Sequence, residues 1–174
     1  NGVKGVKTGY TSKAGRCLVS YVNRDGFELI TVVLGADTRK IRTQDTIKLI
    51  EYTYKNYQQV DLSELLANEY EDWCRVNEKR IWVFKGKEHR PKIYIENSKY
   101  TKFPILKTES IEATSTSNLI FEAPVEANTV VGTITLNKGQ DIIETVEIKT
   151  KEKIDRKGVI YYFLEIMQLL KFAM

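Results

Sequence analysis

The sequence predicts an α+β chain in which antiparallel strands covered by a helix are followed by a small all-β sandwich and a C-terminal amphipathic helix. Three observations predict this class. Alternating apolar runs separated by turn residues fill residues 3–36, apolar residues then recur with helical spacing to about Tyr57, and short β-branched runs follow from Arg80 onward. The predicted boundaries are 1–58 for the first domain, 59–79 for a linker helix, 80–153 for the sandwich and 154–174 for the last helix.

The first part reads as an antiparallel meander with a covering helix. Its second strand alternates through Cys17, Val19 and Tyr21, and residues 23–26 supply turn chemistry with a glycine. Residues 27–36 are dense in Leu, Ile and Val, so we expect this strand to be covered on both faces. The covering helix begins after the cap residues Asp37 and Thr38, and its apolar positions are Ile41, Ile47, Leu49, Ile50 and Tyr54.

The apolar period breaks at residues 58–61, which predicts a domain boundary. Asp61 then caps a short helix over about 62–75, on which Leu66 and Trp73 should be buried. We interpret it as a bridge between domains, and the alternative is a helix that binds a partner. The sandwich strands that follow are expected at 81–84, 92–95, 105–113, 118–122, 129–136 and 142–149. Their carboxylates, such as Glu109, Glu112 and Glu122, fit a solvated sheet face rather than an acid and base pair.

The C-terminal segment 158–174 is too short and too polar to span a bilayer core of roughly 30 Å. Glu165, Gln168 and Lys171 form one narrow polar stripe. This pattern is typical of a helix that lies in the membrane interface. The alternative is a helix packed on its own domain or on a second copy. The broad apolar face contains Phe163, Ile166, Met167, Leu169, Leu170 and Phe172.

Composition excludes several classes of function. The net charge of +4 comes from 27 basic and 23 acidic residues that are mixed along the chain, so no nucleic-acid partner is predicted. The excess of lysine is compatible with an anionic membrane or cell-wall surface. Cys17 and Cys74 have no metal-ligand spacing, and two buried thiols are favoured over one disulfide. His89 lacks the partners of a zinc site or a Ser-His-Asp triad, so we expect a surface histidine and no metal.

The candidate site lies in residues 3–15, on a strand that ends at an edge. Lys7 supplies charge and donors, Thr8 supplies a hydroxyl, and Gly9 leaves the backbone bare for a ligand. Together these residues predict an anion-recognising edge that an extended peptide could join as an added strand. The Lys-Thr-Gly triplet alone is equally compatible with an edge strand that carries a solvated lysine.

The longer string Gly-Val-Lys-Thr-Gly-Tyr-Thr-Ser-Lys-Ala-Gly over 5–15, followed by Leu18-Val19, resembles the third motif of the penicillin-binding serine D-alanyl-D-alanine carboxypeptidases. Residues 123–133 are similar to the C-terminal domain of the same enzymes. The resemblance implies that residues 1–58 belong to a transpeptidase or β-lactamase-like domain. It also implies removal of the terminal D-alanine from peptidoglycan pentapeptides through an acyl-enzyme, acylation by β-lactams, and no metal or organic cofactor.

The resemblance also implies residue roles. Lys7 would be catalytic through its charge and the proton-transfer network, and the Thr8 hydroxyl would bind the substrate's terminal carboxylate. Gly9 would permit close approach, and the backbone N–H of Tyr10 would be one oxyanion-hole donor. A position that is often basic in relatives is Glu28 here, so Arg16 and Arg24 become candidates to replace it.

The sequence contains no serine followed three residues later by lysine, and no Ser-x-Asn. An acyl-transfer enzyme needs an activated nucleophile beside a base. We therefore expect the chain to be the C-terminal portion of a longer enzyme whose N-terminal part is missing, and to be inactive alone. The resemblance places such an enzyme on the outer face of the bacterial cytoplasmic membrane. The alternatives are a non-catalytic envelope spacer or interaction module, and a related β-lactam-recognising hydrolase.

Overall fold

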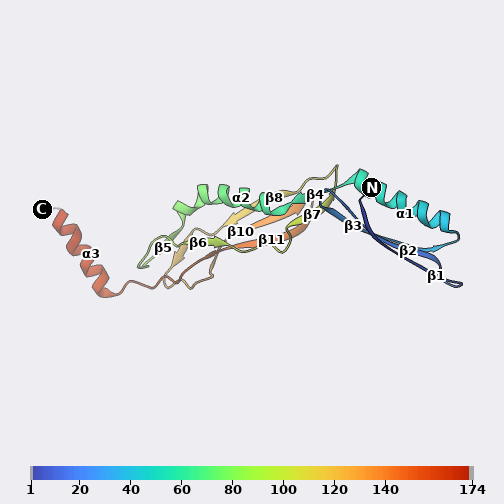
Figure 1. The fold of residues 1–174 in the computed structure, drawn as a ribbon. Helices are drawn as coiled ribbons and strands as arrows, with labels where there is room; N and C mark the ends of the chain where they lie inside the picture. The colour runs from blue at the N-terminus through green and yellow to red at the C-terminus, as the bar shows by residue number, and fades with distance from the viewer. Residues whose placement is uncertain (1, 173–174) are drawn as a thin grey trace. The chain divides into compact units, whose positions relative to one another are not determined.

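The structure, a computed structural model, describes residues 2–172, and for Glu165 and residues 168–172 it describes the backbone alone. The chain forms two compact units (Figure 1). The first contains the residues up to Val60 together with Phe103–Glu109, and the second contains Asp61–Lys102 and the residues from Ser110 onward.

The first unit contains a three-stranded antiparallel sheet in the order β1-β2-β3. Its strands are β1 (Val3–Thr11), β2 (Gly15–Arg24) and β3 (Phe27–Ala36). A two-residue loop joins β2 to β3, with positive φ at Asp25 (52°) and Gly26 (84°). That pair of angles matches the right-handed twist of the flanking strands. The predicted meander is confirmed.

Helix α1 (Arg39–Asn56) covers one face of this sheet (Figure 1). The Thr38 hydroxyl caps it by accepting a hydrogen bond from the Ile41 N–H at 3.1 Å, as its sequence position predicted. The apolar residues buried between the helix and the sheet include Leu18, Val22, Val33 and Ile50.

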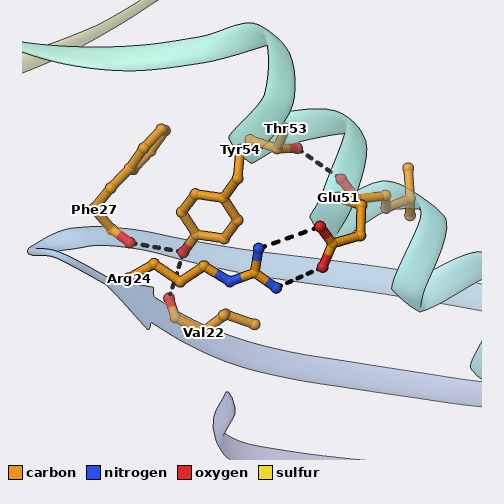
Figure 2. Close-up of polar contacts among 7 residues, drawn as sticks. Val22, Arg24, Phe27, Glu51, Thr53 and Tyr54 are labelled. Carbon is orange, nitrogen blue, oxygen red and sulfur yellow. Dashed lines mark hydrogen bonds and ion pairs between the residues drawn. The ribbon is translucent and has the colours of Figure 1, made fainter. Parts of the chain in front are cut away.

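A polar latch ties the last turns of α1 to the β2–β3 hairpin (Figure 2). The Tyr54 hydroxyl lies 2.7 Å from the Phe27 carbonyl oxygen and 3.3 Å from that of Val22, and can donate to either. Arg24 donates to both carboxylate oxygens of Glu51, at 2.6 and 3.3 Å, and stacks 4.6 Å from the centre of the Tyr54 ring. The hydrogen bonds from Arg24 lower the pKa of Glu51. The latch fixes where α1 lies on the sheet.

Within the described part of the chain β3 is covered on one face, whereas the sequence predicted cover on both faces. Its side chains alternate between buried and exposed, and Ile30, Val32 and Leu34 are 67%, 52% and 69% exposed. A run dense in apolar residues does not reveal whether one face of a strand is covered or both, because the hydrophobic side chains are present either way.

The expected strand over 105–113 is also wrong, because the chain turns in the middle of it. β7 (Lys102–Leu106) pairs with β4 (Tyr57–Asp61), whereas β8 (Glu112–Ser117) joins the sheet of the second unit. Glu109, predicted to be solvated, stabilises this turn by accepting a hydrogen bond from the Leu106 N–H at 2.9 Å.

The second unit is built on a four-stranded antiparallel sheet in the order β6-β11-β10-β8. Its other strands are β6 (Ile93–Ile95), β10 (Val130–Lys138) and β11 (Asp141–Thr150). Helix α2 (Leu62–Asn77) packs on β8 and β10, and a 3-10 turn over Glu78–Arg80 follows it. Trp73 is 2% exposed, and its indole N–H donates to the Thr116 carbonyl at 2.9 Å.

Helix α2 was expected as a linker over 59–79, and the structure makes it part of the second unit's packing. Asp61 caps it as predicted, by accepting a hydrogen bond from the Ser63 N–H at 3.0 Å. The burial of Leu66 and Trp73 is also confirmed. An amphipathic helix has the same sequence pattern whether it bridges two domains or packs on a sheet.

The structure differs from the predicted antiparallel sandwich in a further respect. β5 (Trp82–Phe84) and β9 (Ile120–Glu122) pair in parallel, outside the main sheet. Val83 of β5 packs with Ala123, Val125 and Ile154 in a small apolar core. Short strands do not reveal their direction of pairing in sequence, since a three-residue strand has too few positions for a distinctive pattern.

The chain's last element is α3 (Val159–Phe172). Its described side chains are all exposed, which argues against the alternative of a helix packed on its own domain. Of the residues predicted for the apolar face, Phe163, Ile166 and Met167 are 61%, 56% and 42% exposed. The side chains of Leu169, Leu170 and Phe172 lie outside the described part of the structure. Within residues 2–172, no helix is long and apolar enough to cross a membrane.

The contact between α2 and the sheet can be tested at Gly132. A Cβ atom there would lie 2.6 Å from the Thr116 carbonyl oxygen and 2.7 Å from the Trp73 ring. Gly132→Ala should therefore destabilise the second unit by about 1–3 kcal/mol. Urea unfolding followed by tryptophan fluorescence measures this, because Trp73 and Trp82 both belong to that unit.

Gly158→Ala is the matched control, since a Cβ at Gly158 would meet no atom within 4 Å. If the two variants unfold at the same urea concentration, the packing of Trp73 against Gly132 is not as described.

Candidate functional site

The Lys-Thr-Gly triplet lies in β1, at an edge of the three-stranded sheet. All nine residues of this strand are exposed. Within the described part of the chain β1 pairs with β2 alone, with Lys7 opposite Val19, Thr8 opposite Leu18, and Gly9 opposite Cys17. The outer side of β1 can therefore accept another extended chain.

Lys7 and Thr8 point to opposite faces of the sheet. Lys7 is in register with Val19 and Val32 on the face that α1 does not cover, whereas Thr8 is in register with the buried Leu18. The Lys7 ammonium nevertheless curls towards the strand and donates to the Thr8 carbonyl oxygen at 3.1 Å. A ligand that touches both side chains must lie along the edge itself.

Gly9 is not required by the packing of the described chain. A Cβ atom there would approach the Cys17 side chain at 3.7 Å, which is an ordinary contact. Gly15, the first residue of β2, differs, because its φ is +64° and a Cβ would lie 3.0 Å from Gly35. Gly9 therefore leaves open surface beside the strand, as expected of a position where a ligand approaches the backbone.

Two contacts order the end of β1 around Tyr10. The Thr11 hydroxyl accepts a hydrogen bond from the Ala14 N–H at 2.9 Å, and the Arg16 guanidinium stacks 4.7 Å from the centre of the Tyr10 ring. Tyr10 itself is 64% exposed. The role of its backbone N–H as an oxyanion donor stays a prediction.

Of the residues considered for carboxylate binding, Arg24 and Glu28 form side-chain hydrogen bonds within the first unit. Arg24 belongs to the latch with Glu51 and Tyr54. Glu28 accepts hydrogen bonds from the Tyr21 hydroxyl at 2.8 Å and the Asn23 amide at 3.3 Å. The bond from Tyr21 to Glu28 raises the pKa of Tyr21. Of the arginines named from sequence, Arg16 is therefore the stronger candidate, and it pairs with Tyr10 near Thr8.

A further arginine, Arg42 on α1, was missed by the sequence reasoning. Among the described residues, the Nε atoms of Arg16 and Arg42 are the buried side-chain polar atoms that have no hydrogen-bond partner. Such orphaned donors are uncommon in folded proteins and call for a ligand or another explanation.

The sequence does hold a signal for Arg42. Residues 39–42 place Arg39, Lys40 and Arg42 at the start of α1, where the structure finds no acidic residue in the first turn. Positive charge is unfavourable at a helix N-terminus. A basic first turn therefore indicates a purpose other than helix stability, such as binding an anion.

The remaining candidates carry no catalytic arrangement. Cys17 and Cys74 are free, half-buried thiols. His89 was expected at the surface and is instead half-buried, stacked on Trp82 with ring centres 4.5 Å apart. Its Nδ1 lies 3.2 Å from the Val83 carbonyl oxygen and its Nε2 lies 3.2 Å from the Lys157 ammonium. Across residues 2–172, no group of three or more His, Cys, Asp and Glu side chains could hold a metal ion.

Two family models match the chain, in separate stretches. Residues 1–38 match the D-alanyl-D-alanine carboxypeptidase family, and residues 75–156 match the C-terminal domain of penicillin-binding protein 5. The first stretch contains the free edge of β1, and the second contains most of the second unit.

Curated relatives match along almost the whole chain. The D-alanyl-D-alanine carboxypeptidase DacF of Bacillus subtilis is 26% identical over 174 residues, which cover 95% of this chain and 41% of the relative. DacA of Escherichia coli, also a D-alanyl-D-alanine carboxypeptidase, is 24% identical over 172 residues, which cover 97% of this chain and 40% of the relative. The chain thus spans about two fifths of the length of these relatives.

The fold also matches a solved structure. The crystal structure of the D-alanyl-D-alanine carboxypeptidase DacD from Francisella tularensis aligns with a TM-score of 0.56 at 22% identity, covering 90% of this chain and 37% of that one. The family models, the relatives and this fold agree with one another and with the motif in β1. The chain belongs to the family of the penicillin-binding D-alanyl-D-alanine carboxypeptidases and corresponds to a C-terminal part of such a protein.

Proposed function

We propose that this chain is the C-terminal part of a serine carboxypeptidase that removes the terminal D-alanine from peptidoglycan pentapeptides through an acyl-enzyme. The observation that carries the proposal is the free edge of β1, where the consecutive residues Lys7, Thr8 and Gly9 are all exposed. The proposed reaction follows from the relatives, which are named D-alanyl-D-alanine carboxypeptidases. The β1 edge is a surface on which an extended peptide substrate could bind.

In this proposal the stem peptide lies along β1 as an added strand, beside Gly9. The Thr8 hydroxyl donates a hydrogen bond to its terminal carboxylate. The backbone N–H of Tyr10 faces the oxyanion of the tetrahedral intermediate, and the Lys7 ammonium stabilises charge and takes part in proton transfer. A β-lactam, which carries a carboxylate and an acyl group, would occupy the same edge.

Arg16 and Arg42 supply the positive charge that this carboxylate needs. Their buried Nε–H groups have no acceptor among the described residues, and a carboxylate accepts hydrogen bonds from guanidinium groups well. This assignment replaces Arg24, whose guanidinium is paired with Glu51.

The serine nucleophile and its base lie outside these 174 residues, because the sequence contains no Ser-x-x-Lys. The second unit serves as a spacer that ends in α3. The exposed apolar side chains of α3 attach the protein to the outer face of the cytoplasmic membrane.

One specific observation favours a second candidate, a non-catalytic envelope module. It is the absence of both serine motifs from the sequence. A β-lactamase is disfavoured because the match to the C-terminal domain of penicillin-binding protein 5 covers residues 75–156, beyond the part related to an acyl hydrolase.

Fluorescent penicillin distinguishes the enzyme from the envelope module. The complete gene product should become covalently labelled at a serine, whereas the 174-residue chain should not, because it lacks the nucleophile. In-gel fluorescence followed by peptide mapping measures this. Labelling of the 174-residue chain would refute this account of where the nucleophile lies, and an unlabelled complete product would favour the module.

The substitutions Arg16→Ala and Arg42→Ala in the complete gene product test whether these arginines bind the substrate carboxylate. Loss of a charge-assisted hydrogen bond costs about 1.5–3 kcal/mol, so kcat/KM for a peptide with a free terminal carboxylate should fall roughly 10- to 150-fold. The loss should be much smaller for the same peptide with an amidated terminus. Steady-state hydrolysis of the two peptides measures both effects.

Arg80→Ala is the matched control, because Arg80 is an exposed arginine that belongs to the second unit. If neither Arg16→Ala nor Arg42→Ala lowers kcat/KM more than Arg80→Ala does, the carboxylate is held elsewhere.

A further inference from the structure

The second unit brings two basic segments side by side just before α3. Residues 85–92 and 151–157 run antiparallel and exchange backbone hydrogen bonds. Lys157 N–H donates to the Lys85 carbonyl at 2.8 Å, Lys87 N–H to that of Asp155 at 2.9 Å, and Lys151 N–H to that of Lys92 at 2.7 Å. We call these two segments the basic ribbon.

The net charge of the basic ribbon alone is higher than that of the whole chain. Its 15 residues include eight basic and three acidic side chains, a net charge of +5, against +4 for all 174 residues. Glu122 and Glu126, which pair with ribbon lysines, lower the local net charge to +3. Composition alone suggested that the excess positive charge is spread along the chain. The fold instead brings much of it together in the basic ribbon.

The ion pairs of the basic ribbon are weak enough to exchange for another anion. The distance from the lysine ammonium nitrogen to the nearest glutamate oxygen is 2.6 Å for Lys85 and Glu122, 3.2 Å for Lys92 and Glu152, and 3.0 Å for Lys153 and Glu126. These lysine side chains are 48%, 67% and 51% exposed. Exposed pairs of this kind contribute little stability, so phosphate groups can compete for the lysines at small cost.

The basic ribbon adjoins the tyrosines in the first turn of α3. The Lys87 ammonium lies 5.7 Å from the Tyr161 ring centre, and the Lys157 ammonium lies 6.0 Å from that of Tyr162. Both tyrosines are exposed, at 47% and 41%. Tyrosine favours the level of the lipid head groups, where its hydroxyl is hydrated and its ring is not.

We propose that the basic ribbon is a lipid-contacting surface that binds the phosphates of anionic phospholipid head groups where α3 enters the interface. The inference rests on the proposed attachment of α3 to a membrane. It adds a lipid preference that an apolar helix face does not supply, because basic residues near an anionic bilayer are attracted to it while zwitterionic lipid offers no net charge.

The test is binding of the 174-residue chain to vesicles. One set contains phosphatidylcholine alone and the other contains phosphatidylcholine with phosphatidylglycerol. The ribbon variant replaces four exposed basic residues by glutamine: Arg90, Lys92, Lys151 and Lys153. Its affinity for the anionic vesicles should fall more than about tenfold, with little change on phosphatidylcholine.

The matched control variant also replaces four exposed lysines by glutamine, away from the basic ribbon: Lys48, Lys55, Lys79 and Lys102. It removes the same net charge and should keep most of the affinity. A variant with Lys92, Lys151 and Lys153 replaced by arginine should bind like the parent, which shows that charge rather than a folding defect is responsible. Thermal unfolding of each variant confirms that it is folded.

Removal of residues 159–174 separates this inference from the proposed attachment. If the parent binds neither vesicle, or if the truncated chain binds as well as the parent, attachment through α3 is rejected and the inference falls with it. If the parent binds and needs α3, but the ribbon variant binds anionic vesicles as tightly as the control variant, attachment stands and the basic ribbon is rejected.

Discussion

The arrangement of the candidate site depends on one constraint, namely that among residues 2–172 β1 pairs with β2 alone, so that its other side is open. The register with β2 sets Lys7 and Thr8 on opposite faces, so the edge is the one place that both can reach. Gly9 adds open backbone beside them. A β-strand that is fully paired could carry the same three residues without being able to recognise an extended peptide.

The position of the β1 edge depends on the sheet to which β1 belongs, and α1 packs on that sheet and stabilises it. The Tyr54 hydroxyl and the Arg24–Glu51 pair connect the end of α1 to the hairpin between β2 and β3 (Figure 2). The same helix carries Arg42 near its start, with a buried Nε that has no partner among the described residues. The helix thus serves both the packing of the sheet and, in our proposal, the binding of the carboxylate.

Sequence reasoning found the meander, α1, α2 and the motif strand because each has a local signal: alternation, caps, helical spacing or a long motif. It misjudged β3 and the segment 105–113, because the covering of a sheet face and the partner of a strand depend on residues far away in the chain. It passed over Arg42 because basic residues on a helix usually face solvent. The cluster of charge in the basic ribbon was hidden because its two halves are about 60 residues apart in sequence.

The measurement that tests the central claim most directly is the rate of penicillin acylation of the complete gene product with Lys7→Ala, compared with Lys4→Ala. Both lysines are exposed on β1, but only Lys7 belongs to the proposed catalytic edge. We expect Lys7→Ala to lower the acylation rate by about 10²-fold or more, since preorganised charge stabilisation is worth roughly 3 kcal/mol, and Lys4→Ala to leave it nearly unchanged. Equal acylation rates for the two variants would contradict the assignment of β1 as a wall of the active site.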